Sequence, residues 1–250
     1  MRGGAGGPAE PWRGSAGPLF DRNAARYDLV NRNITIGGDG RWRRDLAARA
    51  ALPAGARVLD ACAGTGLLGL ELAARGAAVT LLDASPVMLS IAQRRAAALG
   101  LTVDVAAADL EAAPAPPGPY DAVGMAFGLR YIREPGAVLQ RLRAALAPEG
   151  RLLLLEAVCP PRGVVGEAAG FYLFQVAPRV ARLLAGRREL YDSLTESVRA
   201  LGDADRVRAL VKAAGLQVEE ERTWACGLVI ALIARLPAAR RGNQPAGARG

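Results

Sequence analysis

The sequence predicts an α/β fold in which helices cover both faces of a mostly parallel β-sheet. Two observations support this prediction. Apolar runs of strand length alternate with helix-length segments from residue 57 to residue 158. A glycine turn, Gly64-Thr65-Gly66, follows the first of these strands, as it does in α/β proteins that hold a ligand between a strand and the next helix.

Each element is predicted from apolar periodicity and from the turn residues that interrupt it. Two helices are expected before the sheet, over residues 19–32 and 41–51. The expected strands are 57–61, 78–82, 101–106, 120–126 and 151–158, with a closing hairpin of 217–223 and 227–232. The expected helices between them are 66–75, 86–99, 134–146 and 203–214. Residues 161–188 interrupt the alternation with a helical stretch whose apolar side chains are spaced for one face.

Length and composition predict a single domain with frayed ends. The chain has 250 residues, of which 51% are hydrophobic, enough for one core. Residues 1–18 and the basic tail 236–250 are rich in small residues and lack periodicity, so both are expected to be disordered. The folded domain is therefore expected over residues 19–235.

The charge of the chain does not indicate a nucleic-acid surface. The net charge is +8, it comes almost entirely from arginine, and the chain has no histidine. A genome-wide compositional bias explains this pattern better than selected binding, so no nucleic-acid partner is expected. The densest arginine clusters, 41–44 and 187–188, flank the expected pocket and leave open a contact with an anionic substrate or membrane surface.

The cysteines and the lengths of the apolar runs indicate the cellular compartment of the protein. Cys62, Cys159 and Cys226 have no paired spacing, so they are expected to be buried, inert thiols in a reducing compartment, and no metal site is expected. The N-terminal residues lack the apolar segment of a signal peptide, so none is expected, and no apolar run has the roughly 20 residues that a membrane helix needs. A cytoplasmic location is expected, with peripheral membrane association left open.

The glycine turn predicts a pocket for a nucleoside-type ligand. Gly64 and Gly66 carry no Cβ, so ligand atoms can approach the backbone. The helix that follows directs its first N–H groups and the positive end of its dipole at the turn. Asp83, at the end of the second strand, is placed to accept hydrogen bonds from vicinal ribose hydroxyls.

The glycine turn is compatible with two different cofactors. Residues 64–69 also match the G-x-G-x-x-G pattern of dinucleotide-binding domains, which bind NAD. Asp60, inside the end of the first strand, favours S-adenosylmethionine, because a carboxylate repels a pyrophosphate and helps to hold the ammonium of a methionine moiety. An ordinary turn capped by Thr65 is the alternative without a cofactor.

Three further segments resemble a known family. Residues 83–89 read Asp-Ala-Ser-Pro-Val-Met-Leu and resemble the D-x-S-x-x-M-L segment of class I methyltransferases, in which Ser85 would cap a helix that begins at Pro86. Residues 107–111, Ala-Ala-Asp-Leu-Glu, resemble the segment after their third strand. Residues 127–130, Phe-Gly-Leu-Arg, are similar to the Phe-Gly-Leu-Arg-Asn signature of the quinone C-methyltransferases of ubiquinone and menaquinone biosynthesis.

The resemblance covers most of the chain and leaves only its two ends outside. It implies the Rossmann-like, seven-stranded methyltransferase fold with an antiparallel last strand. Three positions depart from the family pattern. Tyr131 replaces the family asparagine, the order of Cys62 and Ala63 is swapped, and Leu201-Gly202 replaces an aromatic–proline pair. The change at Tyr131 leaves the exact substrate open.

The turn and the resemblance together imply S-adenosylmethionine as the cofactor. In the family, an acid at the position of Asp109 hydrogen-bonds the adenine amino group. The cofactor-binding residues expected here are Asp60, Gly64, Thr65, Gly66, Asp83, Ala84, Met88, Asp109, Leu110 and Ala126.

The predicted catalytic residues follow from the chemistry of a quinol ring. A ring carbon attacks the methyl group once the ring is phenolate-like, so a fixed cation is needed beside the oxygen, and Arg130 is expected to stabilise the phenolate or orient a water. Arginine hardly loses its proton. Without histidine, Asp109, Tyr131, Tyr27 or a water must take the ring proton. The resemblance places Tyr27 over the cofactor, which implies that it encloses cofactor or substrate; the alternative is a helix aromatic that packs on the sheet. Glu156 either faces the cleft or forms a structural salt bridge.

The remaining expectations concern the substrate. An N-terminal helical cap, 19–52, and a helical insertion, 161–200, are expected to form an apolar cavity over the cofactor, open to a polyprenyl tail. The favoured function is C-methylation of a demethylated quinol. Methylation of another aromatic or polyketide molecule, and cofactor binding without methyl transfer, stay open, as does a homodimer.

Overall fold

The structure is a computed structural model that describes residues 28, 31–32, 34–35, 37–112, 117–179 and 189–237. The expected disordered ends therefore lie outside the described residues, apart from residues 236–237, and so does Tyr27. Most of the expected helix 19–32 lies outside them as well.

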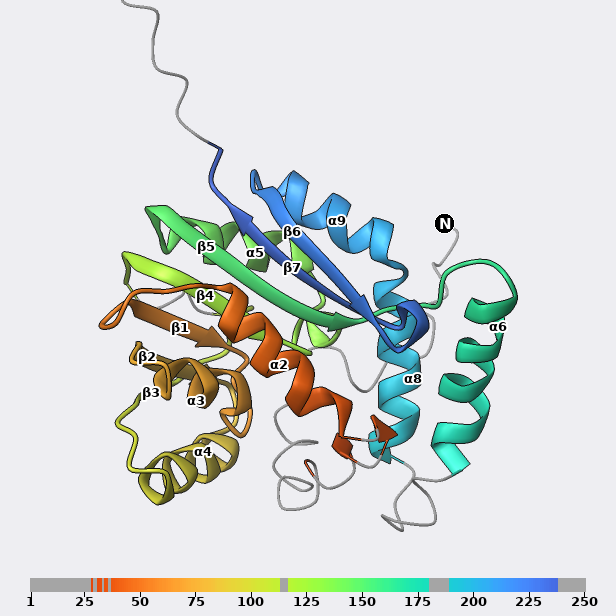
Figure 1. Ribbon diagram of the computed structural model, residues 1–250, viewed down its shortest axis with the longest axis horizontal. Coiled ribbons are helices and arrows are strands. Elements are labelled where there is room, and N and C mark those ends of the chain that lie inside the picture. The colour runs from red at the N-terminus through yellow and green to blue at the C-terminus, as the bar shows by residue number, and fades with distance from the viewer. Residues whose placement is uncertain are drawn as a thin grey trace, which may run out of the picture.

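A single seven-stranded sheet forms the centre of the protein (Figure 1). Its strands are β1 (Arg57–Ala61), β2 (Ala78–Asp83), β3 (Asp104–Ala107), β4 (Tyr120–Ala126), β5 (Leu146–Ala157), β6 (Gln217–Trp224) and β7 (Val229–Arg235). Their spatial order is β3-β2-β1-β4-β5-β7-β6. The first five strands pair in parallel, and β7 is antiparallel to both of its neighbours. The predicted Rossmann-like sheet with an antiparallel last strand is confirmed.

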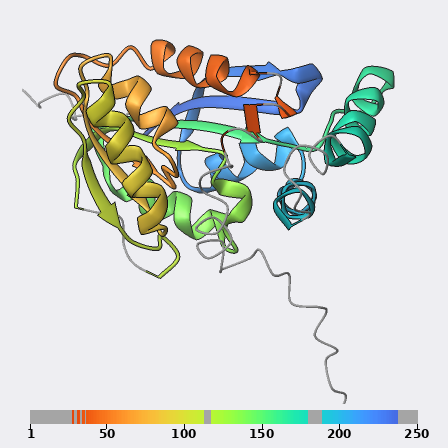
Figure 2. The ribbon, with the colours of Figure 1, turned by 90° about the horizontal axis from the view of Figure 1, so that it is seen from below.

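Helices cover both faces of the sheet (Figure 2). Leu46, Leu72 and Leu89 bury one face under helices α2 (Gly38–Arg49), α3 (Leu67–Ala73) and α4 (Pro86–Ala98). Leu139 and Val207 bury the other face under α5 (Pro135–Ala144) and α9 (Ala204–Ala213). Among the described residues, no helix has the length and hydrophobicity to span a bilayer.

The helical insertion stands beyond the end of the sheet (Figure 1). Its elements are α6 (Val164–Phe171), the π-helical turn η2 (Tyr172–Val176) and α8 (Glu189–Leu201). Two short 3-10 turns, η1 (Leu129–Tyr131) and η3 (Ala225–Gly227), lie at the ends of strands β4 and β6. The insertion therefore faces the strand ends at which a ligand pocket is expected.

Helix α4 begins where its sequence predicts. The hydroxyl of Ser85 accepts the N–H of Met88 over 3.0 Å, and Pro86 occupies the first helical position. Proline fits there because the first helical N–H groups have no partner inside the helix.

Several expected strand boundaries differ from the structure, including both ends of β7, which runs over Val229–Arg235 where 227–232 was expected. The starts of β3 and β5 also differ, and each has a physical cause. Strand β3 begins at Asp104 because the N–H of Leu101 donates to the carbonyl of Ala96 and closes the end of α4. Strand β5 begins already at Leu146, which pairs with Tyr120 ahead of an irregularity in the register. Both differences arise from hydrogen bonds that apolar periodicity does not encode.

Helix α3 packs very closely against the sheet at Gly69. A Cβ built on Gly69 would lie 2.3 Å from Cδ2 of Leu81 and 2.9 Å from Oδ2 of Asp60. Real side chains do not make such contacts, so only glycine lets the helix lie at this depth.

We expect Gly69→Ala to lower the free energy of unfolding by about 1–3 kcal/mol, because the added methyl group overpacks a buried contact. Urea denaturation measures this loss. Gly40→Ala in α2 is the matched control: its Cβ would meet only the end of the Arg44 side chain, at 3.9 Å, and a helical alanine should stabilise by roughly 0.4–1 kcal/mol. Equal effects of the two substitutions would contradict the packing argument.

Candidate active site

The carboxyl ends of β1, β2 and β4 meet at one edge of the sheet, and the candidate site is built there. Strand β1 pairs with β2 through Asp60 and Leu81, and with β4 through Asp60 and Gly124. Strands β2 and β3 lie on one side of β1 in the sheet, whereas β4 and β5 lie on its other side. Ligands of open α/β sheets bind where the strand order reverses in this way.

The glycine turn lies at this edge and is held by Asp83. The N–H of Gly64 donates to Oδ2 of Asp83 over 2.8 Å, and the N–H of Ser85 donates to Oδ1 over 2.8 Å. Gly64 and Gly66 have φ angles of +55° and +80°, which glycine adopts without strain. A Cβ on Gly64 would meet no atom within 4 Å, so this side of the turn is open to a ligand.

Asp60 is buried beneath the turn, with 1% of its surface exposed. Its Oδ2 accepts the N–H of Gly69 over 2.7 Å. Burial raises the pKa of Asp60 to about 7; the bond from Gly69 and the charge of Arg43 oppose this rise, and the charge of Asp83 adds to it. Asp60 therefore titrates near neutral pH, and a cation bound beside it would favour the carboxylate.

The turn is also tied to the N-terminal segment. Thr65 is 3% exposed and donates its hydroxyl proton to Oδ1 of Asp28 over 3.0 Å. The guanidinium of Arg95 pairs with the other oxygen of Asp28. These contacts hold Asp28 against the glycine turn, next in sequence to the predicted residue Tyr27.

The other predicted cofactor residues lie at or just after the ends of β2, β3 and β4. Met88 and Leu110 are buried, Ala126 is half-buried, and Ala84 and Asp109 are exposed. Oδ1 of Asp109 accepts the N–H of Glu111 over 2.8 Å. Their roles stay predictions.

Arg130 forms a buried ion pair with Glu156. Nη1 of Arg130 lies 2.6 Å from Oε1 of Glu156, and the two side chains are 4% and 0% exposed. The N–H of Ala157 donates to the same oxygen over 2.8 Å. The guanidinium carbon lies 4.7 Å from the ring centroid of Tyr131 and 5.5 Å from that of Phe127. The salt bridge that the sequence left open for Glu156 is therefore present, and it fixes the cation.

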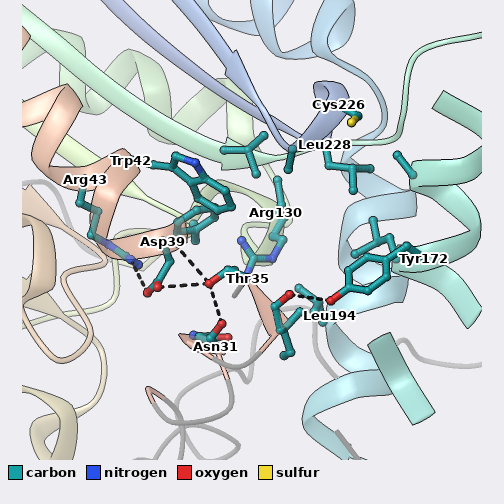
Figure 3. A pocket seen from close by; sticks show the side chains of 17 residues that line it. Asn31, Thr35, Asp39, Trp42, Arg43, Arg130, Tyr172, Leu194, Cys226 and Leu228 are labelled. Atoms are coloured by element: carbon teal, nitrogen blue, oxygen red, sulfur yellow. Dashed lines mark hydrogen bonds and ion pairs between the residues drawn. The ribbon is translucent and has the colours of Figure 1, made fainter. Parts of the chain in front are cut away.

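A cavity of about 350 Å³ adjoins Arg130. Figure 3 shows Arg43 and Tyr172 on opposite sides of the cavity, with Arg130 between them. The polar side also carries Asn31, Thr35 and Asp39, whereas Leu194 and Leu228 lie on the apolar side. Leu173 also lines the cavity. Tyr131 is 8% exposed and is not among the lining residues.

The sequence did not single out a second buried ion pair in this cavity. Nη1 of Arg43 lies 2.9 Å from Oδ2 of Asp39, and the side chains are 7% and 11% exposed. The spacing of four residues in an expected helix was the available signal. This signal did not single out Arg43, because residues 41–44 contain three arginines, Arg41, Arg43 and Arg44.

The cysteine prediction needs a correction. Cys226 is exposed, and it lines the cavity. It lies in η3, within the turn that joins β6 to β7, where Cys226 and Ala225 have φ angles of +56° and +50°. Cys62 and Cys159 are half-buried. Burial raises the pKa of both thiols, that of Cys62 well above the ordinary value, which lowers their reactivity.

Sequence comparison identifies the family. A model described as the ubiE/COQ5 methyltransferase family matches residues 14–235. The chain belongs to this family. A demethylmenaquinone methyltransferase of Thermus thermophilus is 42% identical over 205 residues, which make up 81% of this chain and 93% of the relative. The enzyme is accordingly a methyltransferase, as the resemblance implied.

Solved structures agree on the fold of this family member. The (4+2)-cyclase SpnF superposes with a TM-score of 0.65 at 19% identity, covering 94% of this chain and 100% of SpnF. An S-adenosylmethionine-dependent methyltransferase from Clostridium acetobutylicum has a TM-score of 0.60 at 13% identity, covering 87% and 99% of the two chains. At such identities the likeness establishes the methyltransferase fold alone.

The raised pKa of Asp60 predicts a specific dependence of stability on pH. The folded state holds the Asp60 proton between the ordinary pKa of 3.8 and about 7, so the free energy of unfolding falls as pH rises through this window, by on the order of 4 kcal/mol at most. Asp60→Asn keeps an oxygen acceptor for Gly69 and removes the titration. Its stability relative to the unsubstituted enzyme should therefore increase from pH 5 to pH 8 in urea denaturation.

Asp121→Asn is the control for a general effect of charge, because the exposed carboxylate of Asp121 also accepts a backbone N–H, that of Arg57, over 2.8 Å. Parallel pH profiles for the unsubstituted enzyme and Asp60→Asn would show that Asp60 does not titrate in this range.

Proposed function

We propose that this enzyme transfers a methyl group from S-adenosylmethionine to a ring carbon of a demethylmenaquinol-type quinol. The proposal rests mainly on Arg130, a fixed cation in the wall of a largely apolar cavity. This cavity lies beside the glycine-turn edge, the sheet edge where the carboxyl ends of β1, β2 and β4 meet the turn of residues 64–66. The name of the Thermus relative supports this choice of acceptor.

The residues at the glycine-turn edge fit the cofactor. The open side of Gly64 leaves room against the backbone, and Asp83, which ends β2 and is half-buried, provides carboxylate oxygens at the position expected for a ribose. When bound, S-adenosylmethionine supplies a methyl group on a sulfonium, which a carbon nucleophile accepts. We assign its methionine end to Asp60 and residues 64–66, its ribose to Asp83, Ala84 and Met88, and its adenine to Asp109, Leu110 and Ala126.

Arg130 contributes electrostatic stabilisation. Transfer of the quinol hydroxyl proton to a bound water places negative charge on the oxygen, and a preorganised cation lowers the energy of that charge in a largely apolar site. The pair with Glu156 holds the guanidinium in place, so little reorganisation is needed. Neither Asp109 nor Tyr131 is among the cavity-lining residues, so in this proposal Tyr27 or a water takes the ring proton.

The apolar side of the cavity suits an isoprenoid tail. Leu173, Leu194 and Leu228 come from the insertion and from the segment after η3, and they offer no charge that a hydrocarbon would have to desolvate. On the outer side of the same wall, Val164 and Phe171 of α6 are 83% and 63% exposed, and Figure 2 shows this helix at the rim of the molecule. Their exposure supports a contact with the membrane in which a polyprenyl quinol resides.

The function is tested with methyl-labelled S-adenosylmethionine and a demethylmenaquinol that carries a short prenyl chain. We expect label on a ring carbon, in equal amount to the S-adenosylhomocysteine formed. Label on an oxygen, or tight cofactor binding without labelled product from any quinol, would reject the proposed reaction.

We expect removal of the Arg130 charge to lower kcat about 10²–10³-fold, the usual effect of losing one stabilising group of this kind. Arg130→Met alone would leave Glu156 buried and unpaired, which destabilises strongly. The informative variant therefore combines Arg130→Met with Glu156→Gln. Steady-state kinetics and S-adenosylhomocysteine binding are measured together, and a kcat near that of the unsubstituted enzyme, with intact binding, would remove Arg130 from the mechanism.

A further inference from the structure

The ion pair of Asp39 and Arg43 is rigidly held at the polar side of the cavity. The hydroxyl of Thr35 donates to Oδ1 of Asp39 over 3.2 Å, while Oδ2 of Asp39 accepts from Nη1 of Arg43 over 2.9 Å. Trp42, the neighbour of Arg43 in α2, stacks on Trp224 with ring centroids 6.3 Å apart. The helix and the guanidinium are thus fixed before any ligand binds.

Arg43 lies between this cavity and the glycine-turn edge. Its guanidinium carbon is 4.9 Å from the ring centroid of Phe127, the residue that follows β4. Its charge reaches the carboxyl of Asp60 at the end of β1, where it opposes the effect of burial. Figure 3 shows Arg43 at the side of the cavity away from Tyr172.

The charges at this edge are suited to only one end of an amino acid. Asp60 and Asp83 can attract an ammonium group, but they repel a carboxylate. The methionine moiety of S-adenosylmethionine carries both groups. In the described part of the chain, the arginines that line the cavity are Arg43 and Arg130, and Arg130 is bound to Glu156.

We propose that Arg43 binds the carboxylate of the methionine moiety and that Asp39 is a positioning residue that orients its guanidinium. A guanidinium has five N–H donors in a planar fork that matches a carboxylate. The hydrogen bond from Arg43 to Asp39 uses one nitrogen, Nη1, which leaves donors on the other nitrogens for a ligand. This inference rests on the proposed use of S-adenosylmethionine.

The test compares two ligands by calorimetry. S-adenosylhomocysteine carries the amino-acid end, whereas 5′-methylthioadenosine has the same adenosine and sulfur without it. We expect Arg43→Met to weaken S-adenosylhomocysteine binding about ten- to a hundredfold, the usual value of a charge-assisted bond pair. Binding of 5′-methylthioadenosine should stay unchanged.

Arg44→Met is the matched control, since Arg44 is the next residue of α2 and is exposed; it should alter neither affinity. The double variant Arg43→Met with Asp39→Asn removes both charges, so its loss of S-adenosylhomocysteine affinity cannot be attributed to an unpaired buried carboxylate. Asp39→Asn alone should weaken S-adenosylhomocysteine binding more than 5′-methylthioadenosine binding. It should also raise KM for S-adenosylmethionine by a larger factor than it lowers kcat. A merely structural role would weaken both ligands equally.

Three results would overturn the assignment in distinguishable ways. Equal weakening of both ligands by the double variant would show general damage to the site. Unchanged affinity for both, with a raised KM for the quinol, would place Arg43 at the acceptor instead. Failure of the unsubstituted enzyme to bind either ligand would overturn the proposed cofactor together with this inference.

Discussion

The hydrogen bond from the N–H of Gly69 to the buried carboxyl of Asp60 joins helix α3 to strand β1, and the site depends on it. It places the glycine turn between two rigid elements, and the turn in turn binds the Asp83 carboxylate through Gly64. The close approach requires glycine at position 69. The same burial raises the pKa of Asp60 to about 7. The residue that anchors the turn is therefore also a carboxyl group whose protonation changes near neutral pH.

Two chemically distinct regions meet along this edge. One is the polar rim of the parallel strands, where backbone N–H groups and carboxylates converge; the other is the cavity, whose far wall comes from the insertion. Arg130 and Arg43 lie between the two, each buried and each held by its own carboxylate. Such pairs cost desolvation and add little stability. Their value here lies in fixing two cations where a charged donor and an anionic ring would meet.

Local signals made much of the fold predictable. The succession of strands and helices along the chain, the glycine turn and the Ser85 cap depend on residues close in sequence, so periodicity and turn chemistry revealed them. The start of β5 at Leu146 and the partner of Arg130, which is 26 residues away, depend on tertiary contacts. The exposure of Cys226 depends on the backbone of η3. No local pattern encodes these features, and for the same reason the cluster 41–44 could not show which arginine faces the cavity.

We infer that one ligand lies along the carboxyl ends of β1, β2 and β3, with its sulfur directed toward Arg130. The decisive measurement is a crystal structure with S-adenosylhomocysteine. We expect the ribose hydroxyls on Asp83, the adenine near Asp109, and the sulfur facing the cavity beside Arg130. A ligand bound elsewhere, or one whose sulfur is turned away from that cavity, would contradict it.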